Sequence, residues 1–193
     1  MPRPKSFDPD TVLAKAMGVF WEKGFDAASI SDLTDAMGIN RFSLYDTFGD
    51  KHELYLKTLD AYDRIVMLPF IDRLEAISSL EDLEAYFTMI IDFQHSGETS
   101  LCCMMHKAAI TQAACDQATK DRVECVRNRV HAAMCHALER INKAGELKAN
   151  ININDAGWML KIALAGLATH ATCPIPACDA KAAFCLLIDS LRA

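Results

Sequence analysis

The segment that most constrains this chain is residues 29–51, which reads SISDLTDAMGINRFSLYDTFGDK. Apolar residues recur at helical spacing on both sides of a short turn that begins at Gly38. Asp50 and Glu53 then form a capping box, which is typical of the start of another helix. The pattern predicts a helix-turn-helix backed by a supporting helix, an arrangement that presents one helix to the major groove of DNA.

In the rest of the chain, the residues that start and end helices recur at intervals typical of an all-α protein. Glycine and proline are sparse, and 51% of the residues are hydrophobic, so a helical globular fold is favoured over disorder. Gly24 is expected to end the first helix, Pro69 to kink or end the fourth, and Asp179 to cap the last. About nine helices are predicted, at roughly residues 8–24, 30–37, 41–48, 51–68, 79–97, 101–114, 117–144, 155–171 and 179–191.

We expect two domains in this arrangement. Residues 1–54 are predicted to form a helix-turn-helix DNA-binding domain, and residues 55–193 a helical ligand-binding and dimerisation domain. The net charge of −6 argues against sequence-blind binding to nucleic acid by bulk charge. Specific binding needs positive charge only at the contact face, which Arg3, Lys5 and Arg41 can supply.

The amino-terminal residues, MPRPKSFDPD, contain no apolar core and do not resemble a signal peptide. The most apolar segment, residues 156–168, is too short to cross a bilayer and contains Lys161. We therefore expect a soluble, cytoplasmic protein with no membrane partner. In such a protein the eight cysteines are expected to be free thiols rather than disulfides.

Common enzyme motifs are missing from the sequence. It has no Gly-x-Ser-x-Gly elbow, phosphate loop, dinucleotide fingerprint or His-Glu-x-x-His. We therefore predict no catalytic residue, no cofactor and no enzymatic activity, although catalytic groups scattered in sequence keep an enzyme open as an alternative class. A scaffold that binds other proteins is a further alternative. The set Arg41, Tyr45 and Lys51 favours DNA, because a scaffold has no use for it.

The second helix of the motif, at residues 41–48, carries the candidate DNA contacts. If Leu44 and Phe48 face the core, the polar and aromatic side chains around them remain outside. Arg41 can then reach a guanine edge or a phosphate, and Tyr45 a thymine methyl or a phosphate oxygen. The alternative for Tyr45 is a half-buried packing residue. Thr47 and Lys51 lie where the chain turns back, a place suited to phosphate contacts.

These residues resemble the TetR (tetracycline-repressor-like) family of bacterial transcription regulators. The resemblance covers about the first sixty residues and is carried by Phe20, Gly24-Phe25, residues 29–33, residues 37–39, Ser43-Leu44-Tyr45 and residues 48–51. It implies a homodimer that binds a palindromic double-stranded operator, normally as a repressor released by a small-molecule inducer. On this analogy the DNA-facing positions are Ser29, Ser31, Arg41, Ser43, Tyr45, Thr47 and Lys51.

Phe42 departs from the family pattern, in which a small residue or proline often follows the basic residue. We include Phe42 among the predicted DNA contacts because its ring can make apolar contacts with bases. The operator sequence of a relative is therefore not transferred to this chain.

The helix expected at residues 155–171 is apolar on nearly every side. Such a helix must be covered on several faces. We predict that it forms a homodimeric four-helix interface together with the helix at residues 179–191, the eighth and ninth of the chain. The alternative is that it lies at the centre of a monomeric core.

The predicted inducer site lies among the helices between residues 79 and 171. An apolar, methionine-rich lining suits a flexible, hydrophobic ligand. The alternative for each side chain is an ordinary place in the core. The candidate lining residues are Tyr86, Phe87, Met89, Ile90, Phe93, Met105, Met134, Trp158 and Ile162.

The run Leu101–His106 contains two adjacent cysteines near the expected start of a helix. A helix N-terminus lowers the pKa of a thiol, and the resemblance implies a position at which some relatives carry a cysteine that responds to electrophiles or oxidants. Cys102 or Cys103 is therefore a candidate sensor thiol, with a small buried hydrophobe as the alternative. A metal sensor is a weaker alternative, because the His and Cys residues include no Cys-x-x-Cys pair.

Overall fold

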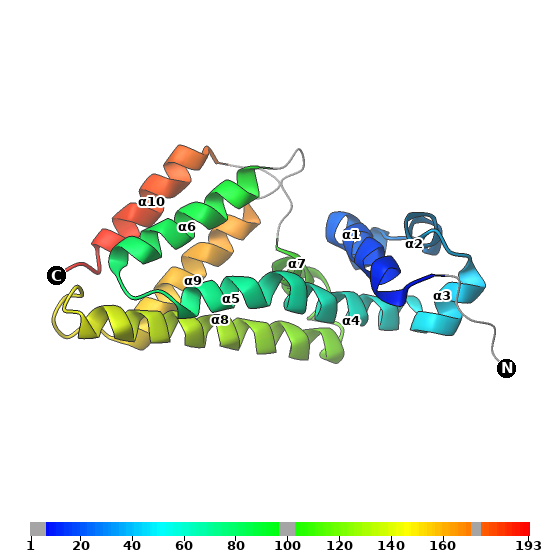
Figure 1. Cartoon of the computed structure of the whole chain (residues 1–193), viewed down its shortest axis with the longest axis horizontal. Coiled ribbons are helices and arrows are strands. Elements are labelled where there is room, and N and C mark those ends of the chain that lie inside the picture. Colours follow the sequence, from blue (N-terminus) through cyan, green and yellow to red (C-terminus); the bar gives the residue numbers. More distant parts are fainter. Residues whose placement is uncertain (1–6, 97–102, 171–174) are drawn as a thin grey trace.

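The computed structural model describes residues 7–96, 103–170 and 175–193, and within these ranges the chain is helical with no extended strand. The all-α prediction is confirmed. The elements are α1 (Pro9–Ala27), α2 (Ile30–Met37), α3 (Arg41–Phe48), α4 (Lys51–Tyr62), the π-helix η1 (Asp63–Met67), α5 (Leu68–Glu75), α6 (Leu80–His95), α7 (Met104–Thr111), α8 (Gln117–Lys143), α9 (Ile153–Thr169) and α10 (Ala177–Asp189). Because α4, η1 and α5 form one continuous helix, the described ranges hold the expected nine (Figure 1).

The first three helices, which we call the head, follow their sequence signals closely. Asp8 caps α1 by accepting from the backbone N–H of Thr11 at 3.0 Å. Gly24, with φ 81°, interrupts the helical geometry of α1 as predicted, although one further turn follows to Ala27. Gly38, with φ 69°, ends α2 in the left-handed conformation, which is accessible to glycine at little cost.

Pro69 lies inside a helix that continues to Glu75. In a regular α-helix the proline ring would clash with the carbonyl four residues earlier, at Ile65. The structure places Ile65 inside η1, where the wider π turn relieves this clash. The last helix also differs from its prediction, because it begins at Ala177 after Pro176, and Asp179 lies in its first turn rather than at the cap.

The head lies at one end of the molecule, and α6, α9 and α10 lie at the other (Figure 1). Between them α8 runs alongside α5. One hydrophobic core joins α6, α8, α9 and α10 around Phe87, Met134 and Phe184. The second core joins the head to the helices behind it, and its buried members are Val12, Ala16, Phe20, Ala28, Leu33, Met37, Leu44, Phe48, Leu54, Tyr55, Leu59, Tyr62, Met104, Met105, Ala108 and Val126.

The second core continues across residue 54, where the boundary between the two domains was expected. Leu54 and Tyr55 are both buried in it, and so are Met104 and Ala108 of α7. The head is therefore packed directly against α4 and α7. In the described ranges, no helix is long and apolar enough to span a membrane.

Asp116 fixes the start of α8 against α4. Its carboxylate accepts from the backbone N–H of Thr119 at 3.0 Å and also bonds the hydroxyl of that residue. The same carboxylate lies 2.8 Å from Nε2 of His52 in α4. The hydrogen bond from the Thr119 hydroxyl is the largest of the effects that lower the pKa of Asp116 to about 2, and the contact with His52 adds to it.

Replacing Asp116 with alanine should lower the free energy of unfolding by about 0.5–2 kcal/mol, because alanine cannot cap α8. A carboxylate with a lowered pKa stabilises the fold above its ordinary pKa of 3.8, and this contribution is lost as the pH falls toward 2. Urea unfolding should therefore show the difference from wild type shrinking between about pH 5 and pH 2. Asp121→Ala on the same helix is the control, expected within about 0.5 kcal/mol of wild type. A difference that does not change with pH would contradict this assignment.

Candidate nucleic-acid interface and ligand cavity

The outer face of α3 presents aromatic and basic side chains to solvent. Leu44 is fully buried and Phe48 nearly so, which fixes the inner face of the helix against the head. On the outer face Phe42 is 78% exposed and Tyr45 48% exposed, and Arg41 is exposed as well. Two exposed aromatic rings beside an exposed guanidinium form a contiguous face that is suited to contact another molecule.

Three serines predicted to face DNA differ in their surroundings. Ser29 caps α2: its hydroxyl donates to Oδ2 of Asp32 at 2.7 Å and accepts from the backbone N–H of Asp32 at 3.0 Å. The Ser29 side chain is therefore engaged in holding α2. Ser31 is exposed in the first turn of α2, and Ser43 is half-buried in α3.

Thr47 and Lys51 lie at the rim of this face. Oγ1 of Thr47 is buried and has no hydrogen-bond partner among the described residues, so it reaches a phosphate only after its side chain rotates. Nζ of Lys51 lies 4.5 Å from the centre of the Phe25 ring and 3.5 Å from the carbonyl oxygen of Asp26. The basic residues Arg3 and Lys5 fall outside the described residues.

Two lysines hold α2 and α3 in position, and neither was predicted from the sequence to do so. Nζ of Lys23 in α1 pairs with Oδ1 of Asp32 at 2.6 Å, and this contact, with the Ser29 hydrogen bonds, lowers the pKa of Asp32. Nζ of Lys57 in α4 donates to the carbonyl oxygen of Phe48 at 2.9 Å, which satisfies the C-terminal end of α3. Both contacts join separate helices, so helical periodicity gave no signal for them.

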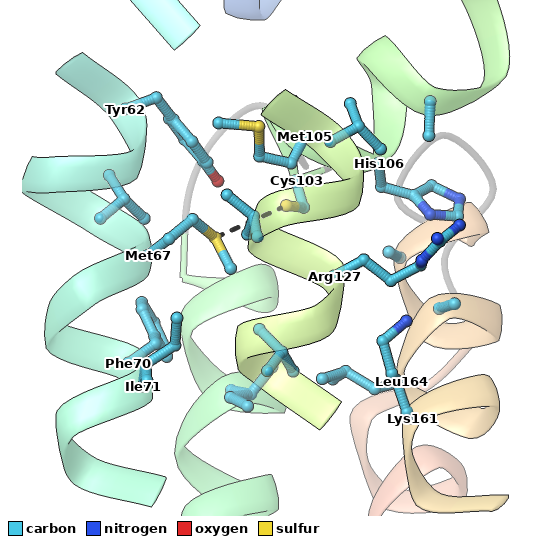
Figure 2. Close-up of a pocket in the computed structure, with 18 of the residues that line it drawn as sticks. Tyr62, Met67, Phe70, Ile71, Cys103, Met105, His106, Arg127, Lys161 and Leu164 are labelled. Atoms are coloured by element: carbon cyan, nitrogen blue, oxygen red, sulfur yellow. Dashed lines mark hydrogen bonds between the residues drawn. The ribbon is translucent and has the colours of Figure 1, made fainter. Parts of the chain in front are cut away.

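A cavity of about 350 Å³ lies behind the head, between α5 and the α7, α8 and α9 helices (Figure 2). Its wall is mostly apolar. Four of the predicted lining residues belong to it: Tyr86, Ile90, Phe93 and Met105. The full lining is Trp21, Tyr62, Val66, Met67, Phe70, Ile71, Tyr86, Ile90, Phe93, Gln94, Cys103, Met105, His106, Ala109, Val123, Val126, Arg127, Val130, Lys161, Leu164, Ala165 and Ala168.

The other five predicted lining residues lie elsewhere. Phe87 stacks on Phe184 with ring centres 4.5 Å apart, and Met134 is fully buried in the same core. Met89 packs at the edge of that core. Trp158 and Ile162 lie on the outer surface of α9, where they are 37% and 67% exposed.

Sequence patterns did not indicate the part of the cavity wall that comes from α1, α4, η1 and α5. Trp21 and Tyr62 pack edge to face with ring centres 5.1 Å apart, and both line the cavity. Met67 and Phe70 continue the wall along the long helix (Figure 2). Because these residues read as ordinary core in an amphipathic pattern, only the packing of distant helices reveals them.

The α7 helix contacts both the cavity and the head. Met105 and His106 line the cavity, and Lys107 points the other way. Nζ of Lys107 donates to the carbonyl oxygens of Glu22 at 2.7 Å and Trp21 at 3.2 Å, close to the break in α1 at Gly24. A displacement of α7 therefore acts directly on the end of α1.

Of the two candidate sensor thiols, Cys103 precedes α7 and Cys102 lies outside the described residues. Cys103 is half-buried and lines the cavity, with Sγ 4.0 Å from Sδ of Met67. The described ranges hold no group of three or more His, Cys, Asp or Glu side chains placed to bind a metal ion. His131 and Cys135 do approach each other, at 3.8 Å between Nε2 and Sγ.

The cysteines should differ in their reaction with iodoacetamide at neutral pH. Burial, with a smaller effect of Glu139, raises the pKa of Cys135, so less of the reactive thiolate is present there. Cys115 and Cys125 are exposed. Mass spectrometry of partly alkylated native protein should therefore show Cys135 modified more slowly than Cys115 and Cys125. Equal rates in the native protein, as in a urea-denatured control, would contradict the buried placement of Cys135.

Comparison with known proteins matches both the head and the whole fold. Residues 12–58 match the family model described as bacterial regulatory proteins, tetR family. An uncharacterised HTH-type transcriptional regulator, YezE of Bacillus subtilis, is 32% identical over 148 residues, which are 76% of this chain and 76% of that protein. The transcriptional repressor ComR of Escherichia coli is 37% identical over 108 residues, 53% of this chain and 50% of that protein.

A solved structure of the TetR family transcriptional regulator CifR, a cysteine mutant in complex with 26-bp double-strand operator DNA, is also similar. It is 28% identical, with a TM-score of 0.85, and the match covers 97% of this chain and 99% of that one. The sequence matches cover the helix-turn-helix and the supporting helix, and the structural match also covers the helical second part of the chain. The chain belongs to the TetR family of bacterial regulatory proteins and is a DNA-binding transcriptional regulator.

Proposed function

We propose that the protein is a homodimeric repressor that reads operator DNA through α3 and is released by a small molecule bound in the cavity. The observation that carries the proposal is the outer face of α3, where Arg41, Phe42 and Tyr45 are exposed while Leu44 and Phe48 anchor the helix. The likeness of this chain to CifR, whose structure was solved in complex with operator DNA, supports a role in DNA binding for this face of α3. The relatives ComR and BdcR of Escherichia coli, both named transcriptional repressors, support repression as the output.

The side chains of α3 suit different parts of a duplex. Arg41 reaches a guanine edge or a phosphate, and Tyr45 reaches a thymine methyl or a phosphate oxygen. Phe42, the most exposed of the three, suits an apolar contact with thymine. Contacts with the phosphate backbone of DNA suit Ser31, Ser43, Lys51 and, after rotation of its side chain, Thr47. Ser29 instead positions α2 through its capping box.

The proposed dimer uses the outer surfaces of α9 and α10. Trp158 and Ile162 on α9 and Leu186 on α10 leave apolar surface exposed, with Leu186 74% exposed. A second copy covers such a face in an isologous interface. The two α3 helices must then lie about 34 Å apart to enter successive major grooves.

Release requires that the ligand bind better to an arrangement of the dimer that cannot hold DNA. The α7 helix supplies a route, because it lines the cavity on one side and holds the end of α1 through Lys107 on the other. The long helix formed by α4, η1 and α5 supplies a second route, since it carries Tyr62 and Met67 in the cavity wall. Thiol sensing through Cys103 is the second candidate, favoured by the place of that residue in the same wall.

The operator interface is tested by a mobility-shift assay with the promoter region beside the protein's own gene. Arg41→Ala and Tyr45→Ala should each weaken binding by about 1–3 kcal/mol, because each removes a contact to a base or phosphate. Lys143→Ala is the matched control, since Lys143 is an exposed cation in the last turn of α8 and that end of α8 lies far from α3 (Figure 1). Binding that survives both head variants, or that falls equally in the control, would overturn the proposed interface.

A further inference from the structure

The cavity has one basic side. His106 of α7, Arg127 of α8 and Lys161 of α9 all line it, and Figure 2 shows their ends gathered together, across the cavity from Tyr62 and Met67. None of the described lining residues is an aspartate or a glutamate. Three groups that carry or can accept positive charge therefore meet beside an otherwise apolar space.

The contacts of these groups leave much of that charge uncompensated. Arg127 Nη2 lies 3.6 Å from Oε1 of Glu124, and of the three groups only Arg127 is paired with a carboxylate within the described residues. Nζ of Lys161 lies 5.3 Å from the centre of the Trp158 ring. Nε2 of His106 lies 3.2 Å from Oγ1 of Thr169.

Neighbouring positive groups also destabilise the charged forms of Lys161 and His106. Burial lowers the pKa of Lys161, and the neighbouring Arg127 lowers it further. Burial likewise lowers the pKa of His106, with a smaller effect from Lys161. A bound anion would relieve both effects, because it supplies the opposite charge that the wall lacks.

The remainder of the wall suits an apolar chain. Met67, Phe70 and Ile71 line the cavity across from the basic side (Figure 2), and Ile90 and Leu164 also belong to the wall. The volume of about 350 Å³ lies near the lower end of the range for ligand pockets, about 300–1,000 Å³, and so suits one medium-length chain.

We propose that this cavity binds an elongated amphipathic carboxylate, with its acidic group among Lys161, Arg127 and His106 and its apolar body along Met67 and Phe70. The assignment rests on the proposed function, because it names the chemical class of the molecule that occupies the inducer site. Charge-assisted hydrogen bonds to the ammonium and guanidinium select the carboxylate over a neutral head group. The apolar wall selects a hydrocarbon body over a small hydrophilic acid.

The test compares three probes by calorimetry: decanoate, 1-decanol with the same chain and no charge, and acetate with the charge and no chain. Decanoate should bind at least about tenfold more tightly than decanol, because charged hydrogen bonds contribute more than about 1.4 kcal/mol. Acetate should show no binding at millimolar concentration. The fluorescence of Trp21, which lines the cavity, should change with decanoate.

The variant Lys161→Met keeps an unbranched side chain, one atom shorter, and removes the charge. It should lose about tenfold in decanoate affinity and keep its decanol affinity, whereas Lys143→Met at the end of α8 should bind both as wild type does. Arg127→Gln should give the same pattern and serves if circular dichroism shows that Lys161→Met is misfolded. Equal binding of decanoate and decanol, an unchanged preference in both variants, or no binding of either probe would overturn the assignment.

A parallel mobility-shift assay separates this assignment from the proposed function. Decanoate that binds with the expected preference and displaces the operator supports both. Decanoate that binds with that preference and leaves the operator complex intact still supports the ligand class, and it contradicts release through this cavity.

Discussion

One hydrophobic core holds the head against the helices that line the cavity, and the rest of the structure depends on it. Phe20 and Leu44 of the head share this core with Leu54 of α4 and with Met104 and Ala108 of α7. Protein interiors are close-packed, so a shift of one member displaces its neighbours rather than being absorbed. The head and α7 must therefore move together or lose buried contacts.

In the proposed mechanism, this constraint links the cavity to α3. Trp21 belongs to α1 and Met105 to α7, yet both line the same space. Lys107 of α7 also bonds the end of α1, and His52 of α4 pairs with Asp116 at the start of α8. In that mechanism, a ligand that prefers one arrangement of these helices changes the position of the head, and by linkage bound DNA changes ligand affinity by the same factor.

Local sequence signals were sufficient for the head and insufficient for the cavity. The capping box of Asp50 and Glu53, the turn at Gly38 and the buried Leu44 are set by residues close in sequence, and the structure confirms each of these features. The cavity wall combines side chains from α1 to α9, so its members depend on tertiary packing. Tyr86 and Met105 belong to it, while Trp158, of similar apolar character, lies on the outer surface.

The continuation of the long helix past Pro69 escaped prediction for a related reason. A proline in a helical pattern indicates a kink or an end, and the π turn that accommodates it at Asp63–Met67 has no comparable sequence signature. The contacts of Lys23 and Lys57 were missed because each joins residues of different helices. Sequence periodicity identifies which face of a helix is buried and does not identify its partner.

The most direct measurement of this coupling is hydrogen exchange of the backbone amides with and without operator DNA. Operator binding to α3 should slow exchange in α7, Met104–Thr111, which lies apart from α3 but shares its core (Figure 1). In Lys107→Met the slowing in α7 should diminish while α3 remains protected, because the polar tie to α1 is lost. Exchange in wild-type α7 that stays unchanged while α3 becomes protected would contradict the shared-core account.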